Sequence, residues 1–519
     1  MLRFHLLRDR EEVANGGGDG ILVAFNKEDL KNVGVEVLKA LGLHPSSIPG
    51  AMKLINAGAD RLSPTKDSPA VCEFLVPDER GVFTRVCLGL LPTFCSRNNT
   101  QSLSHSVSTI VKGNKGSGNL SVVLLCKGNP SIAFAQALAV ARCFPTFSFT
   151  SAARKAASEN KPKDLVDVYL ELDSSETSEL LLSEVEILAE SIRTSQHLVD
   201  MPPCKMNCSW YVDFCQKVAS GLADSGVTIK VIRGKELDEQ GLGGIWGVGK
   251  ASDHPPALVI LTHTPSDEPA AADKQSVCLV GKGIVYDTGG LSIKVPPGMN
   301  GMKDDMGGSA AVLGAFISVV KTGGLPSRRP LHALLCIAEN SVDSAAFRPD
   351  DVLFMLSGKT VEVNNTDAEG RLVLGDGVHY AASRLNPCLL VDIATLTGAQ
   401  LITTGKKHAA VYCSHEDLED LAMTCGKHTG DLTFPMLYAP EFHRPEFKSS
   451  VADMKNSVAD RMNAQASCAA QFIGNHIEEY LEAGNQWMHV DMAGPVLAGD
   501  RASGYGVALL YDIARKFDL

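Results

Sequence analysis

Short apolar runs alternate with helical patterns along most of the chain. In the first part, apolar runs at residues 21–25, 85–91 and 120–126 are each followed by a stretch with apolar residues at three- and four-residue spacing. A continuous apolar run is typical of a buried strand, and a period near 3.6 is typical of an amphipathic helix. The repeated strand and helix segments predict a parallel-rich α/β layer.

A long amphipathic pattern separates this part from the rest of the chain. Leu, Val and Ile recur at helical spacing through residues 174–201, and Pro202 and Pro203 end the pattern. The length of 519 residues exceeds the size at which one hydrophobic core stops growing. We therefore predict an N-terminal α/β domain at residues 1–174, a linker helix at 175–200 and a C-terminal catalytic domain at 201–519.

The second half shows a clearer strand and helix alternation. The predicted buried strands are residues 256–263, 276–281, 331–338, 387–394 and 487–493, and the predicted helices are 308–321, 370–385, 467–481 and 506–517. The predicted fold class is α/β, with two domains that each hold a mostly parallel or mixed sheet flanked by helices. The long helix joins the two domains.

The amino-acid composition limits the classes of partner and the cellular compartment that we expect for this chain. The net charge of −12 argues against nucleic acid as a main partner, because phosphate binding needs clustered Lys and Arg. The 14 cysteines are scattered without a CxxC pair, and the N-terminus MLRFHLLRDREE has no apolar signal region. We expect buried thiols in a reducing, cytoplasmic protein. No apolar run reaches the ~18 residues of a membrane span.

Two glycine-rich stretches concentrate carboxylates and lysines. They are VGKGIVYDTGGLSIKVPPGMNGMKDD from Val280 to Asp305 and NNTDAEGRLVL at residues 364–374. Several of the acids follow predicted strands, at the sheet edge where open α/β folds place their ligands. The candidate acids are Asp287, Asp305, Asp367 and Glu369. In an extended segment, residues two apart point the same way, so Asp367, Glu369 and Arg371 are expected to face one cavity.

Charge counting predicts a pair of divalent cations. Four buried carboxylates without a counter-charge would cost several kcal/mol apiece. Two divalent ions carry +4 against −4, so a lysine that touches both the ions and the acids must be neutral. Lys282 is placed for that role, because desolvation and nearby positive charge lower the pKa of an amine. Oxygen ligands with one nitrogen suit Zn²⁺, Mn²⁺, Mg²⁺ or Co²⁺. There is no HExxH motif, so a single-zinc helix site is not supported.

These motifs resemble the leucyl aminopeptidase (M17) family of metallo-exopeptidases. GKGIVYDTGGLSIK is similar to the family's first metal loop and MKDDMGG to its second, and the signature NTDAEGRL is complete from Asn365 to Leu372. The match continues through IATLTGA and WMHVDMAGP, so it covers roughly residues 178–519. GGIWGVGKA and VADMKNSVADR are most similar to the probable aminopeptidase-like branch.

The resemblance implies a metal-dependent aminopeptidase with two metal ions per subunit. The tight ion would be held by Lys282, Asp287, Asp305 and Glu369, and the exchangeable ion by Asp287, Asp367 and Glu369. The substrate would be a peptide with a free N-terminus, whose amino group binds the exchangeable ion. The family is typically a hexamer, and we expect a homo-oligomer of that kind.

The same resemblance implies the catalytic, bicarbonate-binding and substrate-binding roles of the remaining site residues. Lys294 would stay charged and polarise the scissile carbonyl. Arg371 would hold a bicarbonate that acts as general base, with backbone contacts from Gly370 and Leu396. An apolar pocket for the leucine-like N-terminal side chain would include Met302, Thr395, Gly398 and Ala493.

Three positions depart from the family pattern. Val496 stands where some members have methionine, Asp304 adds an acid beside Asp305, and Asn364 replaces the acid that often precedes the signature. These changes bear on side-chain preference, and Asp304 would favour basic residues weakly.

Two other functions fit part of the pattern. A dinuclear phosphoesterase also needs bridging carboxylates, although such sites usually draw on histidines. Some relatives of the family bind DNA, although the acidic balance weighs against it here.

Overall fold

The computed structural model describes residues 1–7, 20–31, 33–41, 50–77, 82–116, 118–159, 164–173, 175–265 and 274–518. The chain divides into two compact units, residues 1–190 with 427–430 and residues 191–426 with 431–519. The division lies inside helix α7 (Glu176–Asp200), which ends before Pro202. The helix predicted between the units is therefore present, and the predicted domain limits of 174 and 201 stay a prediction.

The first unit is built on a six-stranded sheet. Its strand order is β1 (Leu2–Leu6), β6 (Val166–Leu170), β5 (Leu120–Leu124), β2 (Gly20–Phe25), β4 (Phe83–Leu90) and β3 (Ala70–Pro77). All neighbours are parallel except β3 and β4. Alternate residues of β2 face opposite sides, and Val23 packs with residues of α2 (Val33–Leu41) and α3 (Ala51–Asp60). The helices α4 (Ser104–Asn114), α5 (Pro130–Ala141) and α6 (Ser151–Ser158) and the first part of α7 also belong to this unit.

The second unit is built on an eight-stranded mixed sheet. Its order is β15 (Thr433–Pro435), β14 (Ala409–Cys413), β17 (Gln486–Asp491), β13 (Pro387–Ala394), β9 (Ser276–Asp287), β10 (Leu331–Asn340), β8 (Ala257–His263) and β7 (Val227–Arg233). The central strands β17, β13, β9 and β10 run parallel. Their carboxyl ends therefore meet at one edge of the sheet, where the predicted acids follow.

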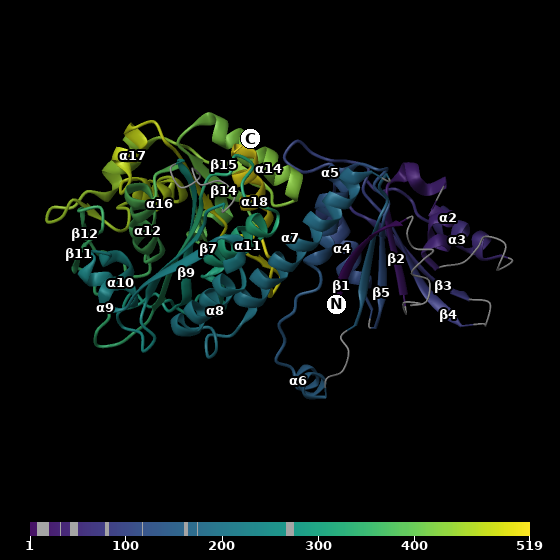
Figure 1. The fold of residues 1–519 in the computed structure, drawn as a ribbon, viewed down its shortest axis with the longest axis horizontal. Helices are drawn as coiled ribbons and strands as arrows, with labels where there is room; N and C mark the ends of the chain where they lie inside the picture. The colour runs from purple at the N-terminus through teal and green to yellow at the C-terminus, as the bar shows by residue number, and fades with distance from the viewer. Residues whose placement is uncertain are drawn as a thin grey trace. The chain divides into compact units, whose positions relative to one another are not determined.

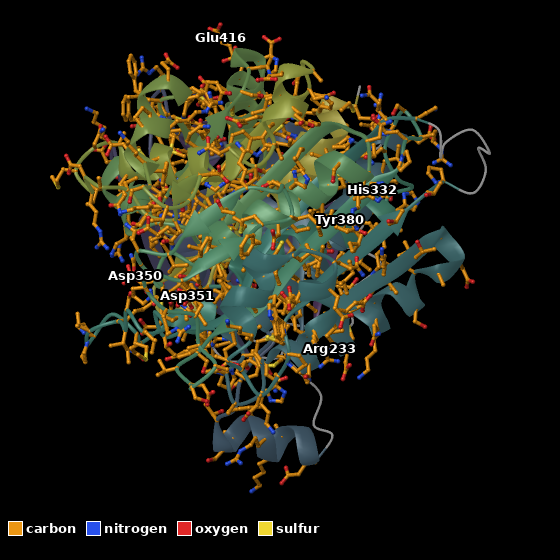
Figure 2. The ribbon with its side chains drawn as sticks, turned by 90° about the vertical axis from the view of Figure 1, so that its left-hand side faces the viewer. Arg233, His332, Asp350, Asp351, Tyr380 and Glu416 are labelled. Carbon is orange, nitrogen blue, oxygen red and sulfur yellow. The ribbon has the colours of Figure 1, made fainter. Side chains whose placement is uncertain are left out.

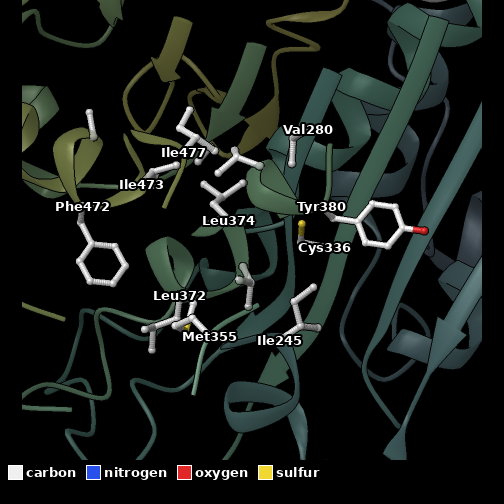
Figure 3. Close-up of a cluster of buried hydrophobic side chains, with 14 of the residues drawn as sticks. Ile245, Val280, Cys336, Met355, Leu372, Leu374, Tyr380, Phe472, Ile473 and Ile477 are labelled. Carbon is white, nitrogen blue, oxygen red and sulfur yellow. The ribbon is translucent and has the colours of Figure 1, made fainter. Parts of the chain in front are cut away.

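Helices cover both faces of this sheet. In Figure 1, α12 (Gly370–Arg384) and α16 (Gln465–Gly474) lie on one side, and α11 (Gly307–Lys321) and α18 (Val507–Phe517) on the other. Figure 3 shows the core between α12 and the strands, where Leu374 of the helix lies on the side of Val280 and Cys336 and Leu372 lies beside Met355. This core fixes the start of α12, which carries the signature motif.

One predicted helix is wrong in its extent. Residues 467–481 do not form a single helix, because α16 ends at Gly474 and a short α17 begins at Glu478. The amides of His476 and Ile477 donate to carbonyls three residues back, and both side chains are buried. The chain turns there to bury these two residues, which overrides the helical pattern. No helix in the described ranges has the length and apolar character to cross a membrane.

The cysteines agree with the expectation of buried thiols. All fourteen are free, and ten of them are buried. Burial is the usual state of a free cysteine, which packs as a small apolar side chain.

Candidate metal centre

Two glycines allow the second metal loop to approach the sheet. A Cβ at Gly281 of β9 would lie 2.5 Å from the Cα of Ser309, and a Cβ at Gly308 would lie 2.2 Å from the carbonyl oxygen of Ile393. Neither distance leaves room for a side chain, so the first turn of α11 rests directly on β9 and β13. Asp305, just before this helix, is thereby held beside the strand ends.

Lys282 lies between two of the predicted acids. Its Nζ is 2.7 Å from Oδ1 of Asp305 and 2.9 Å from Oε1 of Glu369, and it donates to the carbonyl of Thr395 at 3.0 Å. The hydroxyl of Thr395 donates to Asp305 at 2.8 Å. Lys282 is 2% exposed, so this is a buried ion-pair network that joins β9, β13 and the starts of α11 and α12.

Lys294 joins the other two acids. Its Nζ is 2.8 Å from Oδ2 of Asp287 and 2.6 Å from Oδ1 of Asp367. Asp287 also accepts from the amide nitrogen of Gly289 and from Nδ2 of Asn340, both at 2.8 Å. The four metal-loop carboxylates, which are Asp287, Asp305, Asp367 and Glu369, therefore converge as the sequence predicts.

The donor set fits divalent cations. Asp287, Asp367 and Glu369 each offer an oxygen, and these oxygens lie within 4.8 Å of one another. Oδ2 of Asp305 and Oε2 of Glu369 are buried and accept no hydrogen bond from the residues that the structure describes. Buried acceptors are normally satisfied, so these two oxygens point to a missing cationic partner. Clustered carboxylate oxygens with a nearby amine suit Zn²⁺, Mn²⁺, Co²⁺ or Mg²⁺.

Burial and mutual charge shift the pKa values of this cluster. Burial raises the pKa of Asp305, Glu369 and Asp367, and the like charges of neighbouring carboxylates add to the rise. Burial lowers the pKa of Lys282 and Lys294, but the carboxylates around them outweigh it and raise both values above the ordinary range. Both amines are therefore ammonium groups while only carboxylates surround them. The neutral Lys282 predicted above concerns the metal-loaded site and stays a prediction.

The start of α12 places Arg371 beside the acids. Glu369 is the residue that precedes the helix, and Arg371 follows Gly370 in its first turn. Arg371 is buried and donates to the carbonyl of Asn456 at 3.0 Å, and its Nε has no hydrogen-bond partner among the described residues. Burial lowers the pKa of Arg371 to about 10, so the guanidinium is charged at neutral pH. A buried cation with an unused donor is a suitable site for a small anion.

A cavity of about 330 Å³ collects the predicted residues. Its wall includes every predicted site residue except Gly370. The predicted residues in the wall are Lys282, Asp287, Lys294, Met302, Asp305, Asp367, Glu369, Arg371, Thr395, Leu396, Gly398 and Ala493. Gly370 lies behind the wall, because a Cβ there would be 2.5 Å from Cε of Lys282. Residues more than 200 positions apart in the sequence thus share one surface.

The departures from the family pattern fall in different places. Asp304 and Val496 line the cavity, and burial raises the pKa of Asp304 to about 6. Asn364 makes reciprocal hydrogen bonds with Ser457, donating through Nδ2 to its carbonyl and accepting its amide hydrogen. Asn364 therefore tethers the signature loop and is absent from the cavity wall.

Three positioning residues escaped the sequence analysis. Asn340, at the end of β10, donates to both Asp287 and the carbonyl of Thr366. Asn456 binds the backbone of residues 364, 365 and 368, and so holds the signature loop. Asp491 accepts from the amides of Leu396 and Ala493. A polar residue at the end of an apolar strand run was the available signal for Asn340 and Asp491.

Comparison with known proteins connects this geometry to a family. The model described as "Cytosol aminopeptidase family, catalytic domain" matches residues 193–511, and "M17 aminopeptidase N-terminal domain 2" matches residues 46–153. The human "Probable aminopeptidase NPEPL1" is 46% identical over 424 residues, which is 81% of this chain and 77% of the relative. "Leucine aminopeptidase 1" of Caenorhabditis elegans is 41% identical over 431 residues, 82% of this chain and 83% of the relative.

Solved structures agree over nearly the whole chain. The leucyl aminopeptidase of Trypanosoma brucei in complex with bestatin has a TM-score of 0.86 and 34% identity, and the match covers 99% of this chain and 95% of that chain. The Caenorhabditis elegans leucine aminopeptidase structure has a TM-score of 0.82 and 35% identity, with 100% and 98% covered. The mixed α/β fold and the family resemblance are therefore confirmed, and the chain belongs to the M17 cytosol aminopeptidase family as an aminopeptidase.

Proposed function

We propose that this chain is a two-metal aminopeptidase that releases leucine-like apolar residues from peptides with a free N-terminus. The observation that carries the proposal is the convergence of the four metal-loop carboxylates, with two buried oxygens left without partners, in the wall of one cavity. Membership of the aminopeptidase family supports the hydrolysis of peptides, and the cavity residues support this cavity as its site.

The metal-holding residues are Lys282, Asp287, Asp305 and Glu369 for one ion and Asp287, Asp367 and Glu369 for the other. A pair of such ions supplies Lewis acidity and lowers the pKa of water. Hydrogen bonds from other residues hold the metal-loop carboxylates in place, such as the bond that Asn340 donates to Asp287 at 2.8 Å. Zn²⁺, Mn²⁺, Co²⁺ and Mg²⁺ are all compatible with this donor set.

Lys294 and Arg371 complete the catalytic residues. The Lys294 ammonium lines the cavity and is positioned to polarise a scissile carbonyl and to stabilise the negative charge that develops on its oxygen. One such donor is worth about 3 to 4 kcal/mol in related reactions. Arg371, with backbone contacts from Gly370 and Leu396, would hold a bicarbonate that supplies general base and acid chemistry. The unused donor of Arg371 supports this assignment.

The pocket for the N-terminal side chain is formed by Met302, Thr395, Gly398 and Ala493. All four line the cavity, and none of the four carries a charged side chain. Apolar contact is the main recognition that such a wall offers, which supports a leucine-like residue.

The test compares two substrates on metal-depleted and reloaded protein. Leucine amide should be hydrolysed only after Mn²⁺, Co²⁺, Zn²⁺ or Mg²⁺ is returned, and N-acetyl-leucine amide should not be hydrolysed, because the free amine is needed for binding. Hydrolysis that survives chelation, or equal rates on both substrates, would contradict the mechanism. Hydrolysis of a phosphate ester is measured in parallel to test for phosphoesterase activity. A gel shift at several salt concentrations tests for DNA binding.

The proposal includes the assembly and the compartment. A homo-hexamer is supported by family membership, and light scattering of the purified protein tests it. A cytoplasmic location is supported by the unpaired cysteines, and imaging of the tagged chain in its own cells tests it.

A further inference from the structure

Asp304 contributes a carboxylate to the cavity wall that the metal site does not account for. It ends the short 3-10 turn η5 (Met302–Asp304), directly before Asp305. The residue is 8% exposed and lines the cavity together with Met302 and Val496. No described side chain forms a hydrogen bond or an ion pair with its carboxylate.

The three lysines whose charges act on Asp304 make their direct contacts with other groups. Lys303 extends its Nζ to the carbonyl of Asp200 at 2.8 Å. Lys282 and Lys294 each lie between two of the metal-loop carboxylates. Asp304 therefore stands in the cavity wall without a hydrogen bond or ion pair from a described side chain, and a buried carboxylate without a direct partner is costly.

We propose that Asp304 pairs with the cationic head of an N-terminal lysine or arginine in the substrate. The inference rests on the proposed aminopeptidase function and extends its substrate class from leucine-like residues to basic ones. The aliphatic stem of such a side chain packs on the apolar wall of Met302 and Val496, and the charged head reaches a polar group at the end. One pocket thus accepts both leucine and lysine.

The magnitude follows from the pairing of two charges away from bulk water. Removal of one partner of such a pair typically changes affinity by about thirtyfold or more. The effect falls on lysine and arginine and not on norleucine, which has a straight apolar side chain without the charge. Specificity is therefore measured as a ratio of kcat/KM values for two substrates.

The experiment uses metal-loaded full-length protein and the variant Asp304→Asn, with the metal content of each measured. The ratio of kcat/KM for lysine amide over norleucine amide should fall about thirtyfold or more in the variant, mainly through KM. The matched control is Glu416→Gln, which removes a carboxylate from the exposed rim of the molecule (Figure 2) and should leave the ratio unchanged. An equal ratio in wild type and Asp304→Asn overturns the assignment.

Binding of free lysine and free norleucine, measured by titration calorimetry, separates this inference from the proposed function. If the wild type prefers lysine, Asp304→Asn does not, and neither amide is hydrolysed, then Asp304 keeps its role and the peptidase mechanism fails. If the wild type binds lysine no better than norleucine, the role of Asp304 is overturned even where leucine amide is a good substrate.

Discussion

Gly370→Ala tests whether the start of α12 fixes Lys282 in the metal centre. The new Cβ would lie 2.5 Å from Cε, 2.7 Å from Nζ and 2.9 Å from Cδ of Lys282. These are contacts with the far end of a flexible side chain, so the backbone can stay and Lys282 must move. The movement takes its Nζ away from Asp305, Glu369 and the carbonyl of Thr395.

The expected change in the free energy of unfolding of Gly370→Ala has two opposing contributions. Separation of a buried ion pair costs about 3 to 5 kcal/mol, and Lys282 has a side chain that is only 3% exposed. Alanine in place of glycine in a helix returns about 1 kcal/mol. Metal-free Gly370→Ala should therefore be less stable by about 2 to 4 kcal/mol. Misplacement of a metal-site residue typically lowers metal affinity about 10- to 100-fold.

Two measurements check this prediction. Chemical denaturation of the metal-free protein gives the change in the free energy of unfolding, and competitive metal titration gives the affinity. Gly221→Ala is the matched control, because it ends α8 (Cys208–Gly221) with nothing within 4 Å of its added Cβ. Wild-type metal affinity in Gly370→Ala would refute the view that this glycine positions Lys282.

Three further predictions concern single residues. Lys294→Ala should fold and bind metal but lose about 100-fold or more in kcat on leucine amide, and full activity would remove Lys294 from the mechanism. Gly308→Ala should lower the free energy of unfolding by about 3 kcal/mol, measured by urea denaturation, because the carbonyl of Ile393 is backbone and cannot yield. Burial and the charges of Lys359 and His379 lower the pKa of His476 to about 3. Because the unfolded chain takes up this proton below pH 6.5, stability should fall as pH drops from 6.5 towards 3, by up to about 1.4 kcal/mol per unit. His476→Gln should flatten that slope in denaturation curves, and an equal slope in the variant would contradict the buried neutral imidazole.

The strands that sequence patterns predicted well are those buried on both faces. The interval 387–394 matches β13 to the residue, because Pro387 begins an apolar run that only Asp392 interrupts. By contrast, β7 was not predicted. Its sequence VTIKVIR alternates apolar and polar residues over its first five positions at the sheet edge, where Lys230 is exposed and Arg233 is partly exposed. A continuous apolar run marks a central strand, but short alternation is a weaker signal.

The candidate site was predictable where charge carries the information. Four carboxylates and two lysines lie in two glycine-rich loops, and this pattern predicts that they come together in space. All six residues line one cavity. Asn340 and Asn456 are neutral and lie outside the two metal-loop segments, so charge counting does not link them to Asp287 or Arg371. Their roles depend on strand register and loop packing, such as the pairing of Asn340 with Asp287 across β10 and β9, which only the folded chain supplies.

The settings of the two lysines favour different roles. Lys282 lies inside β9 and pairs in register with Cys336 of β10, so its backbone is held within the sheet. Lys294 lies on the loop after β9, between Ile293 and Val295, which are 56% and 76% exposed. A metal ligand needs a fixed position, since coordination distances tolerate little variation. A group that meets the substrate benefits from a loop that can adjust as the peptide enters. This contrast supports Lys282 as the ligand and Lys294 as the residue that contacts the substrate carbonyl.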